Sequence, residues 1–205
     1  MESADDHRQD HHGPRYHGSH EKERGKFTQE YEQVFDKYFF VFGNKFKHKF
    51  LWEVLEVLKN TEHNFIFIGA KEEGYVEKNI YGYMSGNLPD EFIDYLIHCS
   101  QGILFPSLYE GFGLPILKGI EFDKKIIVND TDLNRELKEY FECYGENILM
   151  FAESSQVKGL LDQVAANPKV RYKNDKKVMR TWKDVAVDSE IFLRKILEQE
   201  VDFQL

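Results

Sequence analysis

One stretch of the sequence, ILFPSLYEGFGLPILKGIE at positions 103–121, decides the fold. It opens with three apolar residues, continues through a loop with two glycines, and ends with apolar residues at helical spacing after Pro115. A short continuous apolar run is typical of a strand that is buried on both faces of a parallel sheet. Proline is favoured in the first turn of a helix. The stretch therefore predicts a strand, a tight loop and a helix in succession.

The same alternation of short apolar runs and amphipathic segments continues along the chain from about residue 28. Further strands are predicted at 38–42, 65–68, 80–83, 126–128 and 148–151. Helices are predicted from the spacing of apolar residues at 50–58, 92–97, 157–164 and 182–197. This alternation predicts an α/β fold: a Rossmann-like open parallel sheet of about six strands, flanked by helices and joined by right-handed crossovers.

Charge and composition exclude several classes of protein. The 205 residues hold 27 lysines and arginines against 36 aspartates and glutamates, a net charge of −9, which argues against broad nucleic-acid binding. The sequence has no apolar run long enough for a transmembrane segment and no secretory signal. Two cysteines, Cys99 and Cys143, suit a reducing compartment. We therefore expect a cytoplasmic protein, either free or at the inner face of a membrane.

The first 27 residues differ in composition from the rest of the chain. They hold five of the eight histidines and few apolar side chains. Such a stretch cannot bury enough surface to offset its chain entropy, so a disordered His-rich tail is expected. Metal binding is the alternative, but the histidine spacing resembles no closed zinc site, and no metal site is predicted. This divides the chain into a tail at 1–27 and one domain at 28–205.

Two loops that follow predicted strands carry residues suited to ligand binding, because ligands of open α/β sheets bind at the carboxyl ends of the strands. The first, GNKFKHK at 43–49, has three lysines ahead of a helix and suits a phosphate; a solvated basic turn is the alternative. The second places Glu110 beside Gly111 and Gly113, which permit close backbone approach to a ligand. A glycine-rich turn with a surface glutamate is the alternative. The first loop has the pattern of neither a Walker nor a GxGxxG motif.

A resemblance to a known family rests on the motif FPSLYEGFGLP at 105–115 and on segments around it. These are YFFVFGNKFKHKFL, FIFIGA, IYGYMSGNLPDEFIDYLIHCSQGILFPS, KKIIVNDTDLNRELKEY and the terminal TWKDVAVDSEIFLRKIL. Over about residues 37–200 they resemble the C-terminal, nucleotide-sugar-binding domain of group 1 retaining glycosyltransferases, one half of a GT-B architecture. The resemblance implies metal-independent transfer of a hexose from a nucleoside diphosphate sugar with retention, as in polysaccharide biosynthesis. It implies no cofactor beyond this donor substrate.

The resemblance also implies roles for individual residues. Glu110 would hold hydroxyls of the donor sugar, Lys49 would neutralise the leaving diphosphate, and Lys45 would stand where relatives have an arginine. These three are the predicted catalytic residues. The other predicted donor-binding residues are Gly43, Asn44, Gly69, Tyr83, Gly111, Phe112, Gly113, Leu114 and Lys118.

Lys118 departs from the family pattern. Relatives have a second glutamate at this position, which accepts hydrogen bonds from ribose hydroxyls, whereas a lysine can only donate. Restoring a carboxylate is therefore expected to raise nucleotide affinity. A different motif, Asp130-Thr131-Asp132, has the letters of a metal-binding Asp-x-Asp sequence. Because it precedes a predicted helix, we interpret it as a helix cap.

Length is the second departure, because relatives carry two such domains and the acceptor site lies on the other one. An N-terminal acceptor domain or a partner subunit is therefore expected, and the isolated chain should bind a nucleotide sugar without transferring it. A non-catalytic nucleotide-sugar-binding or scaffolding module is the main alternative. A sugar-nucleotide epimerase is a weaker one, because the chain shows no acid/base residues for that chemistry.

Overall fold

The computed structural model describes residues 34–201 except 44, 45, 87 and 174–181. The predicted tail at 1–27 and the predicted site residues Asn44 and Lys45 lie outside the described residues. The elements in chain order are β1 (Phe39–Phe42), η2 (Lys47–Lys49), α2 (Leu51–Leu58), β2 (Phe65–Ala70), β3 (Gly74–Glu77), β4 (Ile80–Met84), α3 (Asp90–Cys99), β5 (Ile103–Phe105), α4 (Leu114–Glu121), β6 (Ile126–Asn129), α5 (Asp132–Tyr140), η3 (Gly145–Asn147), β7 (Ile148–Phe151), η4 (Ser154–Gln156), α6 (Val157–Ala166) and α7 (Trp182–Val201).

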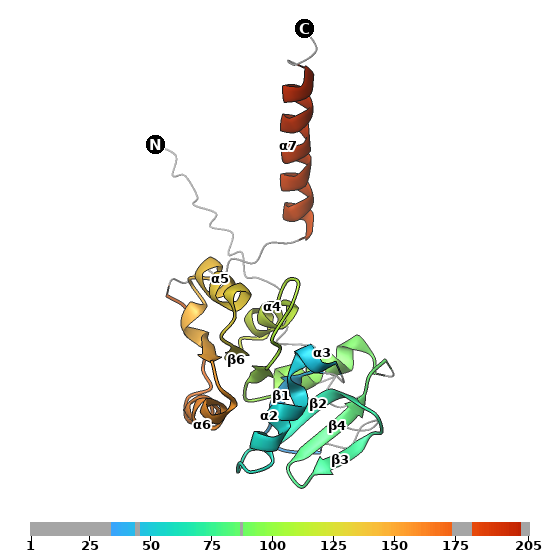
Figure 1. Cartoon of the computed structure of the whole chain (residues 1–205), viewed down its shortest axis with the longest axis vertical. Helices are drawn as coiled ribbons and strands as arrows, with labels where there is room; N and C mark the ends of the chain where they lie inside the picture. Colours follow the sequence, from blue (N-terminus) through green and yellow to red (C-terminus); the bar gives the residue numbers. More distant parts are fainter. Residues whose placement is uncertain (1–33, 44–45, 87, 174–181, 202–205) are drawn as a thin grey trace, which may run out of the picture.

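Seven strands form one sheet in the order β3-β4-β2-β1-β5-β6-β7 (Figure 1). Every neighbouring pair is parallel except β3 and β4. The predicted Rossmann-like α/β fold and its six strands are confirmed. The additional strand, β3, lies at the edge of the sheet, where Tyr75 is 61% exposed and Val76 is 43% exposed. An exposed edge strand needs no continuous apolar run, so the sequence pattern did not predict it.

Two apolar layers cover the two faces of the sheet. The first layer joins α3, α4 and α5 to the sheet, and the second joins α2 and α6 to it. In β1, Phe40 belongs to the first layer whereas Phe39 and Val41 belong to the second, and all three are fully buried. Burial on both faces explains why the strands are continuous apolar runs. Because β1 and β5 are parallel neighbours, the helices that follow them, α2 and α4, both begin at the carboxyl edge of the sheet.

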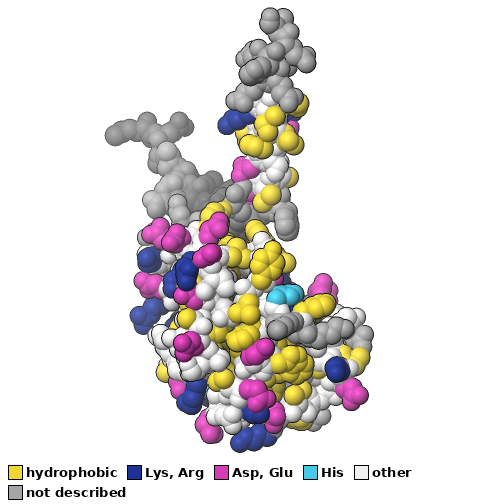
Figure 2. All heavy atoms as spheres, in the orientation of Figure 1, with side chains coloured by type: hydrophobic (Ala, Val, Ile, Leu, Met, Phe, Trp, Pro, Cys, Tyr) yellow, Lys and Arg dark blue, Asp and Glu magenta, His cyan; other side chains and the backbone are white. Residues whose placement is uncertain are grey.

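A short strap, residues 167–173, runs from α6 back to the first layer, where Val170 and Tyr172 pack. Asn147 holds the strap with both ends of its amide: Nδ2 donates to the carbonyl of Arg171 at 2.6 Å, and Oδ1 accepts from the N–H of Arg171 at 3.0 Å. Beyond it, α7 stands away from the sheet domain (Figure 1). Apolar side chains lie exposed along α7 (Figure 2). None of the described helices has the length and apolar character needed to cross a lipid bilayer.

Candidate functional site

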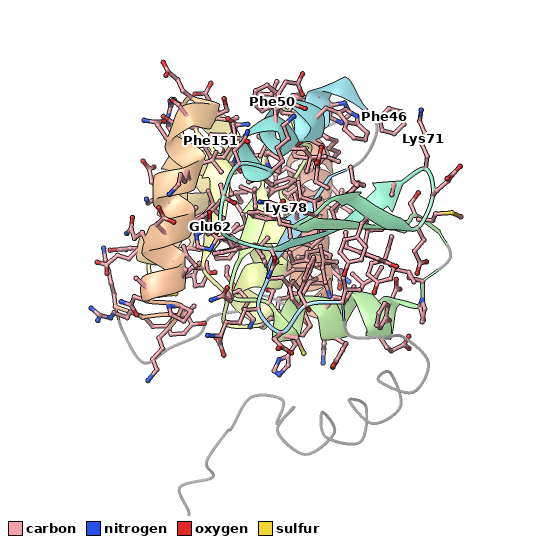
Figure 3. The ribbon with its side chains drawn as sticks, turned by 90° about the horizontal axis from the view of Figure 1, so that it is seen from below. Phe46, Phe50, Glu62, Lys71, Lys78 and Phe151 are labelled. Atoms are coloured by element: carbon pink, nitrogen blue, oxygen red, sulfur yellow. The ribbon has the colours of Figure 1, made fainter. Side chains whose placement is uncertain are left out.

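The two loops predicted to bind ligand lie against each other at the carboxyl edge. Their strands, β1 and β5, are neighbours at the point where the chain order of the sheet reverses, which is where open α/β sheets bind ligands. The N–H of Leu108 donates to the carbonyl of His48 at 2.8 Å, which ties the two loops together. The hydroxyl of Ser107 lies 3.4 Å from the same carbonyl oxygen. In Figure 3, Phe46 from the loop after β1 and Lys71 from the loop after β2 point toward the same side of the molecule.

Lys49 and Glu110, the two predicted catalytic residues that the structure describes, form an ion pair across these loops. Their side chains are 20% and 21% exposed, so the pair is partly withdrawn from water. The Nζ atom of Lys49 also lies 6.0 Å from the centre of the Phe105 ring, within the range of a cation–π contact. The structure therefore brings a cation and a carboxylate together at the switch point of the sheet.

The helix α4 begins directly after this pair. Gly113 is its N-cap, with φ of 78°, and no side chain caps the first turn. The left-handed backbone angle favours glycine, and a Cβ atom at Gly113 would lie 2.5 Å from Cδ1 of Leu137, so any side chain there would also force Leu137 to shift. Pro115 stands in the first turn as predicted. An uncapped helix N-terminus carries a partial positive charge and suits an anionic ligand.

The helix α2 also begins at this edge without a side-chain cap, and its N-cap, Phe50, has φ of 50°. A left-handed backbone at a bulky residue is uncommon and costs free energy. Nothing in the sequence pattern indicated it, because phenylalanine at this position fits the predicted helix equally well. Phe50 thus joins Gly113 as a left-handed residue that leads a loop of the site into its helix.

Lys118 lies in the second turn of α4, where its Nζ donates to Oδ1 of Asp94 at 2.7 Å and lies 3.3 Å from Oε2 of Glu121. Burial lowers the pKa of Lys118, but the hydrogen bond to Asp94 and the charges of both carboxylates outweigh burial, and the pKa is raised. Lys118 is therefore protonated and engaged by two carboxylates. Asp94, on α3, was not among the predicted site residues, because the contact depends on how α3 and α4 pack.

Three other predicted residues lie at the ends of strands. Gly43 follows β1, and a Cβ atom there would lie 2.8 Å from Cδ1 of Leu51, so glycine lets the loop pass close to α2. Gly69 has φ of 121° near the end of β2. Tyr83 is 3% exposed, and its ring packs edge to face against the ring of Phe92, with 5.6 Å between the ring centres. The structure thus gives the side chain of Tyr83 a place in the core.

The two loops that carry Lys49 and Glu110 also carry exposed apolar side chains. We call this set the apolar rim; its exposed fractions run from 49% to 74%, and its members are Phe46, Leu108, Tyr109, Phe112 and Leu114. Of the predicted donor-binding residues, Phe112 and Leu114 belong to this rim. Gly111 lies between its members, where an added Cβ atom would have no neighbour within 4 Å. The backbone contacts predicted for these three residues remain predictions.

The Asp130-Thr131-Asp132 segment caps α5, as predicted. The hydroxyl of Thr131 accepts from the N–H of Asn134 at 3.3 Å, and both aspartates pair with Arg135. Within the described residues, no three histidine, cysteine, aspartate or glutamate side chains lie together as a group that could hold a metal ion.

Comparison with known proteins bears on the fold. The sequence matches no protein-family model and no curated protein. The structure is similar to sucrose-phosphate synthase from Thermosynechococcus elongatus, with a TM-score of 0.64 and 11% identity over 86% of this chain and 49% of that chain. It is also similar to WaaG, a glycosyltransferase involved in lipopolysaccharide biosynthesis, with a TM-score of 0.52 and 13% identity over 70% of this chain and 42% of that chain. The chain therefore corresponds to about half the length of each.

Proposed function

We propose that this chain, which has the fold of one half of a GT-B glycosyltransferase, binds a nucleoside diphosphate sugar and forms the donor side of a hexosyl transfer with retention and without a metal ion. One observation carries the proposal. Lys49 and Glu110 meet at the switch point of the sheet, beside the uncapped N-terminus of α4. A cation and the positive end of a helix suit the diphosphate, and a carboxylate suits the hydroxyls of the sugar.

Charge develops on the diphosphate as it departs from the sugar. Preorganised cations and helix dipoles at that position lower the barrier, because they stabilise the charge without having to reorient. Lys49 and the N-terminus of α4 supply them in this proposal, and Lys45 and Asn44 belong to the loop that carries Lys49. Glu110 accepts hydrogen bonds from sugar hydroxyls and orients the ring. The backbone of Gly111, Phe112, Gly113 and Leu114 lines the remaining side.

A second domain or subunit completes the enzyme in this proposal. The chain spans about half of each similar structure, and the apolar rim and the exposed side chains of α7 offer surface for another polypeptide. The acceptor would bind on that second part. The isolated chain is therefore expected to bind the donor and to transfer no sugar.

Calorimetric titration tests the proposal. UDP, GDP and ADP, and then the corresponding nucleotide sugars, are titrated into the wild-type chain and into the Lys49→Ala variant. The substitution removes a charge-assisted contact of roughly 1.5–3 kcal/mol, so affinity for the preferred diphosphate should fall about 10- to 150-fold. Lys195→Ala on the exposed face of α7 is the matched control. Unchanged affinity in a folded Lys49→Ala protein, or no binding of any of these ligands, would refute the proposal.

A non-catalytic module is distinguished by the second half of the experiment. A candidate acceptor domain is added to the chain, and sugar transfer is measured with the donor that binds best. Transfer that depends on both parts and on Lys49 supports an enzyme. Donor binding with no transfer in the presence of a domain that completes the GT-B pair supports the binding module.

A further inference from the structure

We propose that Glu110 is an internal competitor for Lys49: the diphosphate of the ligand displaces the Glu110 carboxylate from Lys49, and the displaced carboxylate then becomes available to the sugar. The inference rests on the proposed function and deepens it, because it predicts how the two ends of the ligand are coupled. It comes from the ion pair that these two side chains form with each other in the structure.

The partial burial of the Lys49–Glu110 ion pair makes it a contact that an anionic ligand of Lys49 competes with. Both side chains are only about one-fifth exposed, so the interaction is less screened than a pair on the open surface. Of the described carboxylates, Glu110 is the one that pairs with Lys49. A phosphate oxygen that approaches Lys49 meets the Glu110 carboxylate at the same ammonium group, and because the two anions repel each other, binding of the phosphate favours displacement of the carboxylate.

The surrounding structure holds Lys49 in place without the ion pair. Its N–H donates to the carbonyl of Phe46 at 2.9 Å, and its Nζ lies over the ring of Phe105, which is buried at the end of β5. The two loops are joined by the backbone hydrogen bond from Leu108 to His48. Loss of the Glu110 carboxylate should therefore leave Lys49 at the switch point of the sheet.

Displacement couples the two ends of the ligand. While Glu110 accepts from Lys49, part of its acceptor capacity is taken and less remains for sugar hydroxyls. A bare diphosphate must break the ion pair and gains no sugar contact in return. A diphosphate sugar breaks the same pair and then engages the released carboxylate. The two parts of the ligand should therefore bind with positive coupling, as two ligands do when each favours the same state of a site.

The Glu110→Gln substitution tests this, because it keeps the shape of the side chain and removes its charge. Inorganic pyrophosphate, which needs no choice of base, is titrated into the wild type, Glu110→Gln, Lys49→Ala and the double variant. Removing the competitor should tighten pyrophosphate binding about three- to tenfold. The gain should vanish in the Lys49→Ala background, because the competition is for Lys49. Glu139→Gln, an exposed position on α5, controls for the change in net charge.

The second arm measures the sugar end. For the best-bound pair among UDP and UDP-glucose, GDP and GDP-mannose, and ADP and ADP-glucose, the ratio of the two affinities is compared between wild type and Glu110→Gln. The substitution should shift this ratio against the sugar-bearing ligand by about tenfold, while affinity for the bare diphosphate rises.

The outcomes separate this inference from the proposed function. If wild type binds pyrophosphate or a nucleoside diphosphate but Glu110→Gln binds it no tighter, the competition is wrong and the proposed function stands. A gain of the same size in the Lys49→Ala background would show a general charge effect and also overturn the competition. If neither wild type nor Glu110→Gln binds pyrophosphate or any nucleoside diphosphate, both proposals fail.

Discussion

Replacing Lys118 by glutamate is expected to destabilise the seam between α3 and α4 and not to improve nucleotide binding. The family pattern predicted a gain in affinity on the assumption that Lys118 was directed at a ligand. In the structure its ammonium group donates to Asp94 at 2.7 Å and lies 3.3 Å from Glu121. Lys118→Glu would therefore gather three carboxylates in one place and remove the cation that holds the first two.

The cost follows from the exposure and spacing of these groups. Each of the three side chains is 35–36% exposed, so each lost ion pair contributes only about 0.2–1 kcal/mol. Two like charges about 4 Å apart repel by roughly 1 kcal/mol in water and roughly 4 kcal/mol near a protein surface, and a partly exposed site lies toward the lower value. The total is about 1–3 kcal/mol of unfolding free energy. For a domain of this size that lowers the melting temperature by roughly 3–10 °C.

Thermal unfolding at low salt, followed by circular dichroism, measures this change. Lys195→Glu on α7 makes the same change in net charge away from the seam and should leave the melting temperature almost unaffected. Asp94→Asn combined with Lys118→Glu should recover part of the loss, because it removes one of the three charges. An unchanged melting temperature together with nucleotide affinity raised tenfold or more would refute the reasoning and show that Lys118 faces the ligand.

Three further predictions concern Gly113 and two contacts elsewhere in the fold. Gly113→Ala should lower unfolding free energy by about 2 kcal/mol, measured by urea denaturation, because its Cβ meets Leu137 at a left-handed φ; full stability would mean that the N-cap relaxes freely. Burial lowers the pKa of Lys124 to about 8 from its ordinary 10.5, so with rising pH the folded state loses this proton before the unfolded state does. The unfolding free energy of the wild type, measured relative to that of Lys124→Met, should therefore rise between pH 8 and 10.5. A flat difference across that pH range, measured by thermal unfolding, would contradict this. Asn147→Ala removes both hydrogen bonds to Arg171, so proteolytic cleavage within 167–173 should become several-fold faster while cleavage elsewhere keeps its rate. Equal cleavage rates of this segment in the variant and the wild type would show that apolar contacts hold the strap.

The fold could be predicted because burial on both faces leaves a strong mark on the sequence. Ile148–Phe151 and the first three residues of β6 are runs of apolar residues, and the helices along the chain carry apolar residues at helical spacing. The edge strand Gly74–Glu77 could not be found in this way, because its side chains are largely exposed and only pairing with β4 defines it. Pairing is a property of the assembled sheet.

The site was predicted loop by loop, and its geometry was not. Lys49 and Glu110 were each identified from their own loop, but they are 61 positions apart and meet only because β1 and β5 are adjacent. The partner of Lys118 depends in the same way on two helices packing side by side. The resemblance also suggested a donor contact for Tyr83; the structure packs its ring against Phe92 in the core, and the donor contact stays a prediction. Local sequence indicates which residues can do chemistry, and the tertiary arrangement decides which of them meet.

The central position of β1 has a consequence for how the protein is made. β1 pairs on one side with β2 and on the other with β5, in registers that include Phe40 with both Ile66 and Ile103. Because ribosomes add roughly 5–20 residues per second, Ile103 is synthesised about 3–13 s after Phe40. During that interval one edge of a fully apolar strand has no neighbour, which exposes the nascent chain to intermolecular pairing. The strand order that brings the two loops of the candidate site together therefore also leaves newly made chains dependent on prompt completion of the sheet or on a chaperone.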